Sequence, residues 1–133
     1  MDGIECIYWG IFFEKEDDTF FDGRLDRKIV HPHMTFGYKT PMPPQLLGKE
    51  ASVQVCGYGN DGRNEALLVV WEFDDLRRYW NHDPRGHITL SVSENGRPVD
   101  SKNLNYELFA PNKRQRKVGR FGYFDGENVR FER

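Results

Sequence analysis

Apolar, β-branched and aromatic residues gather in seven stretches along the chain, and polar turn residues separate the stretches. Runs of this kind, bounded by Gly, Pro, Asn and Asp, are typical of β-strands. The predicted strands cover residues 4–13, 27–38, 51–58, 65–72, 86–93, 116–124 and 127–132. The hairpin-type dipeptides Asp22-Gly23, Asp61-Gly62, Asn95-Gly96 and Asp125-Gly126 supply residues that adopt positive φ between strands.

Helical signals are few. Asp74 or Asp75 is suited to cap a short helix, and the apolar residues that then recur at helical spacing are Leu76, Tyr79 and Trp80. Pro43-Pro44 begins one further helical turn, which Gly48 ends. We therefore predict an α+β fold dominated by antiparallel sheet, as a single domain over residues 1–133 with few short helices.

Composition and charge narrow the classes of protein that fit. A chain of 133 residues with 38% hydrophobic residues can bury a core of its own. Its net charge of −2 disfavours wide, nonspecific binding of duplex nucleic acid, and it does not exclude a small nucleotide or an RNA end. No apolar run approaches the roughly 20 residues that span a bilayer. The N-terminus starts acidic and lacks the basic region of a signal peptide, so we expect a cytoplasmic protein.

The charges are unevenly distributed. Residues 14–18 are mostly acidic, and five basic residues crowd into 113–120. Such runs are usually solvated loops, and the functional alternative for the basic run is an electropositive flap over an anionic substrate. The C-terminal hairpin, about residues 116–132, has no assigned role: it closes a cleft, pairs with another chain or completes a sheet edge.

A short motif occurs twice. His33-Met34-Thr35-Phe36 and His87-Ile88-Thr89-Leu90 both read His, apolar, Thr, apolar, and both lie in predicted strands. Side chains alternate between the two faces of a strand, so each segment buries its apolar pair and presents a His–Thr pair on the other face. If the two strands lie side by side, the two pairs converge.

Converging pairs of this kind suit phosphodiester chemistry. One imidazole takes a proton from the attacking oxygen and the other gives a proton to the leaving oxygen, and a pKa near 6.5 suits both tasks. The hydroxyls of Thr35 and Thr89 are suited to hydrogen-bond the non-bridging oxygens. The scheme needs neither a metal nor another cofactor, and no histidine is accompanied by carboxylates at ligand spacing. The pattern leaves open which imidazole is the base.

The paired H-x-T motifs resemble those of the 2H phosphoesterase superfamily. This superfamily includes LigT-like RNA cyclic phosphodiesterases, the cyclic phosphodiesterase domains of fungal tRNA ligases, and phage enzymes that degrade cyclic-nucleotide signals. Residues 53–70 resemble the hairpin between the two motifs, and residues 87–104 resemble the second motif with its Pro-Val-x-Ser-x-Asn-Leu tail. The resemblance covers roughly residues 5–108.

The resemblance implies two lobes of antiparallel sheet around a central cleft and a metal-independent phosphodiesterase. His33 and His87 would be its acid–base pair, and Thr35 and Thr89 would bind the phosphate. The 54-residue spacing of the motifs is short, and the helices that usually pack outside the sheets are largely missing. We expect a stand-alone chain without a ligase or kinase domain, which weakens the interpretation as a tRNA-repair enzyme and leaves room for a small viral counter-defence enzyme.

Strand alternation adds candidates for lining the substrate. Lys39 shares the face of His33, and Ser91 shares the face of His87. Aromatic side chains near the motifs, among them Tyr38 and Trp9, are candidates for stacking on a nucleobase.

The expected partner is a small nucleotide or an RNA end: a 2′,3′-cyclic phosphate or a cyclic mono- or oligonucleotide. The sequence does not indicate an oligomeric state. A non-catalytic nucleotide- or RNA-binding domain of the same fold is the alternative. A structural or interaction protein, in which the two H-x-T strands occur by chance, is a third hypothesis.

Overall fold

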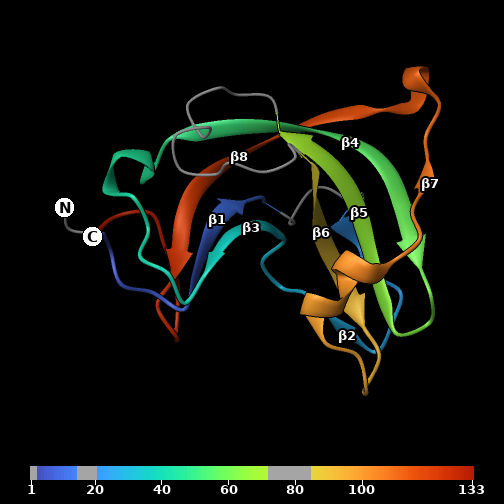
Figure 1. Ribbon diagram of the computed structural model, residues 1–133, viewed down its shortest axis with the longest axis horizontal. Helices are drawn as coiled ribbons and strands as arrows, with labels where there is room; N and C mark the ends of the chain where they lie inside the picture. The colour runs from blue at the N-terminus through green and yellow to red at the C-terminus, as the bar shows by residue number, and fades with distance from the viewer. Residues whose placement is uncertain (1–2, 15–20, 72–84) are drawn as a thin grey trace.

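The computed structural model describes residues 3–14, 21–71 and 85–133, which form one largely antiparallel sheet. Its strands are β1 (Tyr8–Phe12), β2 (Arg27–Lys28), β3 (His33–Tyr38), β4 (Glu50–Asn60), β5 (Asn64–Trp71), β6 (Arg85–Val92), β7 (Glu107–Leu108), β8 (Gln115–Phe124) and β9 (Val129–Arg130). The order is β2-β6-β5-β4-β8-β1-β3, with β7 on β4 and β9 on β8 (Figure 1). The helices of the described residues include the 3₁₀ turns η2 (Pro44–Leu46), η4 (Pro98–Asn103) and η5 (Pro111–Lys113).

The sheet agrees with the coarse prediction of a mainly antiparallel α+β chain with few helices. Six of the seven predicted stretches contain one strand each, with ends displaced by a few residues. The short strand β7 was not predicted, since two residues carry no periodic signal. The predicted helix at Leu76, Tyr79 and Trp80 lies outside the described residues.

The stretch 27–38 is two strands, and the prediction of a single strand there is wrong. β2 pairs with β6, whereas β3 pairs with β1 at the other end of the strand order. Pro32 lies in the connection, where it has no N–H for a ladder and restricts the backbone of the residue before it. The Pro32 carbonyl instead accepts a hydrogen bond from the Phe13 N–H at 2.9 Å.

Two of the four predicted hairpin dipeptides adopt positive φ. Gly62 (φ 84°) turns β4 into β5, and Gly126 (φ 108°) turns β8 into β9. In the first turn Asp61 Oδ1 accepts hydrogen bonds from the N–H groups of Arg63 and Asn64, at 2.9 and 2.8 Å. Gly23 and Gly96 do not adopt positive φ.

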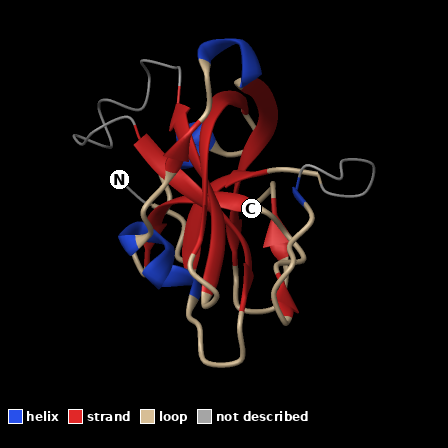
Figure 2. Cartoon of the chain, turned by 90° about the vertical axis from the view of Figure 1, so that its right-hand side faces the viewer, coloured by secondary structure: helices blue, strands red, loops and turns tan. Residues whose placement is uncertain are grey.

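The curvature of the sheet brings its ends together. β3 and β6 lie almost at opposite ends of the strand order, yet they approach each other in space. Figure 1 shows the long strands β4 and β8 bending across the molecule, so that the β1–β3 part faces the β5–β6 part. Figure 2, turned by 90°, shows that strands make up most of the regular structure. Both ends bury side chains in one core, to which β3 contributes Met34 and Phe36 and β6 contributes Ile88 and Leu90. The fold thus places the two H-x-T segments beside each other.

Candidate functional site

The apolar residues of both motifs anchor their strands. Met34, Phe36, Ile88 and Leu90 are all buried, as the alternation of strand faces predicts. His33 and His87 are each half-buried. The histidines therefore sit between a packed core and the surface, on strands that the core holds together.

His33 is held by aromatic rings of the neighbouring strand. Its imidazole stacks on Tyr8, with centroids 4.6 Å apart, and lies 5.3 Å from the centroid of Phe12. Its Nδ1 lies 2.8 Å from the backbone carbonyl oxygen of His31. Because a carbonyl oxygen only accepts, Nδ1 carries the proton and, in the neutral ring, Nε2 has the free lone pair. Burial is the main reason why the pKa of His33 is lowered.

The pKa of His87 is lowered by its surroundings, which include His33. Burial lowers the pKa of His87 most, and the positive charges of His33 and Lys102 lower it further. The positive charges of His33 and Lys102 are therefore close enough to act on His87, and an anion bound there would relieve that repulsion. Lys102 was not among the candidates. Its signal in the sequence is its place in the tail that follows the second motif, which forms η4 against β6.

The two threonines have different environments. Thr35 is exposed on β3. Thr89 is buried beneath η4, where its Oγ1 lies 2.8 Å from Ser101 Oγ and 3.3 Å from the carbonyl oxygen of Pro98. Asn64 Nδ2 donates to the same Ser101 hydroxyl at 3.0 Å. Thr35 is open to a ligand, whereas the Thr89 hydroxyl fastens η4, and with it Lys102, beside His87.

Two of the four predicted lining residues are exposed, and the other two are buried. Tyr38 is 63% exposed, and Lys39 Nζ lies 5.5 Å from the centroid of its ring. Trp9 and Ser91 are buried, 4% and 0% exposed, so neither reaches an open surface. The Ser91 hydroxyl is engaged within the protein: it donates to Glu65 at 2.8 Å and accepts from the Leu25 N–H at 3.0 Å.

A β-bulge explains why simple alternation fails after Thr35. Trp9 pairs with Gly37 and Gly10 pairs with Thr35, so Phe36 has no partner on β1. Phe36 and Gly37 are consequently both buried, and the exposed face resumes at Tyr38. Tyr38, opposite Tyr8, therefore continues the face of His33, and the alternation that predicted Lys39 on that face is wrong.

No family model matches this chain. Among curated proteins, the Cys-Gly metallodipeptidase dug1 of Schizosaccharomyces pombe is 28% identical over 89 residues, which are 64% of this chain. The chain spans only 16% of the length of that protein. A likeness of this extent assigns no family.

In residues 3–14, 21–71 and 85–133 no three His, Cys, Asp or Glu side chains are grouped so as to hold a metal ion. Within those same ranges no helix is long and apolar enough to cross a membrane.

Proposed function

We propose that this protein is a metal-independent phosphodiesterase of the 2H type, with His33 and His87 as its general acid–base pair. Its substrate is a nucleotide phosphodiester, either a 2′,3′-cyclic phosphate end or a cyclic mono- or oligonucleotide signal. If the substrate is a cyclic mono- or oligonucleotide signal, the protein would serve a phage as a counter-defence enzyme. The observation that carries the proposal is the approach of β3 to β6, which brings together two H-x-T motifs whose histidines are 54 residues apart. The lowering of the His87 pKa by the charge of His33 supports it.

The tautomer of His33 supports an assignment of roles. With Nδ1–H donating to the His31 carbonyl, Nε2 is available to accept a proton from water. The water oxygen then forms a bond to phosphorus, and the bond from phosphorus to the leaving ester oxygen breaks. That oxygen takes a proton from His87, and the transferred protons leave His33 protonated and His87 neutral. Proton exchange with solvent restores both.

The charges around the site favour an anionic ligand. Both imidazoles have lowered pKa values, so the free protein holds them mainly neutral near pH 7. A bound phosphodiester raises both pKa values, which favours the protonated His87 that the scheme requires. Burial against Tyr8 and Phe12 opposes protonation of His33, which the scheme requires to be neutral. The exposed Thr35 hydroxyl and the Lys102 ammonium are suited to bind its non-bridging oxygens. Thr89 then acts as a positioning residue for η4.

Turnover without metal tests the proposal. The protein is incubated in EDTA with 2′,3′-cyclic mononucleotides, an RNA ending in a cyclic phosphate, and cyclic di- and trinucleotides. We expect the wild type to cleave at least one of them, and His33→Ala and His87→Ala each to lose about 10²-fold or more in rate. Cleavage that survives in both variants, or no cleavage of any substrate, would contradict the proposal.

One observation favours the alternative, a non-catalytic nucleotide-binding domain. The buried Thr89 hydroxyl has partners within the protein, so only one of the two motifs presents both of its polar side chains. The double variant His33→Ala/His87→Ala separates the two functions. An enzyme loses turnover and keeps substrate affinity within about tenfold, whereas a pure binder has no turnover to lose.

A further inference from the structure

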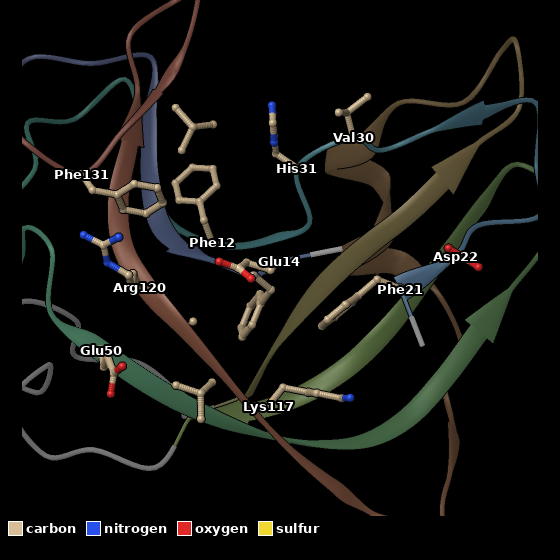
Figure 3. Close-up of a pocket in the computed structure, with 14 residues that line it drawn as sticks. Phe12, Glu14, Phe21, Asp22, Val30, His31, Glu50, Lys117, Arg120 and Phe131 are labelled. Atoms are coloured by element: carbon tan, nitrogen blue, oxygen red, sulfur yellow. The ribbon is translucent and has the colours of Figure 1, made fainter. Parts of the chain in front are cut away.

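A second feature of interest is a cavity beside the first motif. It has a volume of about 900 Å³ and lies where β1, β8 and the residues before β3 meet the C-terminal strand β9. Phe12, His31, Arg120 and Phe131 line one part of it, as Figure 3 shows. The ring of Phe12 also lies 5.3 Å from that of His33, so this part of the cavity adjoins the proposed catalytic group.

Strand register connects the cavity to His33. Phe12 is directly opposite His33 on one side and directly opposite Arg120 on the other. Directly opposed residues of antiparallel strands project from the same face, so all three side chains belong to one row across the sheet. Two strand spacings separate the ends of the row, roughly 10 Å between Cα atoms. Arg120 therefore lies on the same face as His33, the proposed general base, and two strands away from it.

Arg120 and Phe131 form a pair within this cavity. The guanidinium carbon lies 4.4 Å from the centroid of the Phe131 ring, and that ring meets Phe12 edge-on at 6.1 Å. Phe131 packs over Gly122, where a Cβ would lie 2.8 Å from a ring atom. Arg120 makes no ion pair with a carboxylate of the described residues, although Glu50 is opposite it on β4. A guanidinium stacked on a ring is suited to bind a phosphate while the half-buried ring contacts a base.

The rest of the lining is acidic as well as basic. Carboxylates of Glu14, Asp22 and Glu50 also face the cavity. They disfavour a phosphate at their own positions and accept hydrogen bonds from the amino group of a nucleobase or from ribose hydroxyls. The lining thus suits a nucleoside with its phosphate directed to Arg120 better than it suits a bare polyanion.

We propose that the C-terminal hairpin β8–β9 forms a second nucleotide subsite, in which Arg120 binds the phosphate adjacent to the scissile one and Phe131 contacts its base. This inference rests on the proposed function, since it takes His33 as the point of cleavage. The substrate then has at least two nucleotides, as a linear end or a cyclic oligonucleotide, and a 2′,3′-cyclic mononucleotide fills only part of the site.

Calorimetric binding tests this without turnover. The His87→Ala protein is titrated with adenosine 2′,3′-cyclic phosphate, with the adenosine dinucleotide ending in the same cyclic phosphate, and with the 3′,3′-cyclic adenosine dinucleotide. We expect one of the dinucleotides to bind at least about tenfold more tightly than the mononucleotide. Adding Arg120→Ala reduces that advantage to about threefold or less, and Arg120→Lys restores part of it. The tighter of the two dinucleotides identifies the linear or the cyclic substrate.

Lys113→Ala is the matched control, since it removes one positive charge from the exposed turn η5, outside the cavity. Equal affinity for mono- and dinucleotides, or an equal effect of Arg120→Ala and Lys113→Ala, would overturn the subsite. A thermal melt of each variant checks folding, and Arg120→Lys keeps the test decisive if the alanine variant unfolds. If the protein prefers dinucleotides but the wild type shows no turnover, the phosphodiesterase proposal is refuted and the subsite stands. If the wild type shows turnover without a preference for dinucleotides, the subsite is refuted and the phosphodiesterase proposal stands.

Discussion

At the scale of single residues, the two motifs look alike in sequence and differ in structure. Thr35 is exposed, while Thr89 is buried and bonded to Ser101. Alternation of strand faces predicts which residues enter the core, and the burial of Met34 and Ile88 agrees with it. It does not predict that a distant turn, η4, covers the second threonine, because that contact depends on the tertiary fold.

Because of this difference, we expect Thr→Val to affect mainly stability at position 89 and mainly turnover at position 35. Thr89→Val removes the hydroxyl that bonds Ser101 and the Pro98 carbonyl, and it should lower the free energy of unfolding by about 1–3 kcal/mol. Thr35→Val should change it by less than about 0.5 kcal/mol and lower turnover by about tenfold or more, through a lost hydrogen bond to the phosphoryl group. Denaturant unfolding and steady-state rates measure both. A Thr35→Val protein with wild-type turnover would remove Thr35 from the site.

At the scale of elements, the segment that leads into β2 depends on a buried carboxylate. Glu65 on β5 is 1% exposed and accepts hydrogen bonds from the Arg24 N–H at 2.7 Å, from Ser91 at 2.8 Å and from the Tyr58 hydroxyl. The Leu25 N–H donates to Ser91 at 3.0 Å. These bonds fasten the chain that leads into β2 against β6, and so fix where the following residues cross to β3.

Removal of the Glu65 carboxylate should weaken the attachment of the segment around Arg24 and Leu25 to the sheet. Glu65→Gln puts an amide donor in place of one of the two oxygens that together accept three hydrogen bonds, and we expect it to cost about 1–3 kcal/mol of stability. Hydrogen exchange should become faster at the amides of Arg24 and Leu25 more than in β4 or β8. Glu94→Gln, at an exposed position, is the control. Equal exchange in the two variants would show that Glu65 does not hold the segment.

Elements also show where sequence reasoning succeeds and fails. Six predicted strands and the turns at Gly62 and Gly126 are present, because local composition and the need for positive φ determine them. The division of 27–38 was missed. Pro32 signals a break, but only the pairing of β2 with β6 and β3 with β1 shows that the chain crosses between strands far apart in the sheet.

At the scale of the whole molecule, the central feature is a sheet curved enough to bring β3 to β6. The sequence predicts two His–Thr strands and, through resemblance, their convergence. The contributions of Lys102 and Arg120 come from outside the motifs, on η4 and β8, and depend on how those elements pack. The central claim is that His33 and His87 share one anion site.

An NMR titration of the histidine ring signals tests that claim most directly. We expect the pKa of His87 to lie below the ordinary 6.5, to rise in His33→Ala because a neighbouring positive charge is lost, and to rise in the wild type when adenosine 3′-monophosphate binds. The pKa of His33 should rise with the same ligand. A His87 pKa that responds neither to the loss of His33 nor to the nucleotide would contradict a shared site.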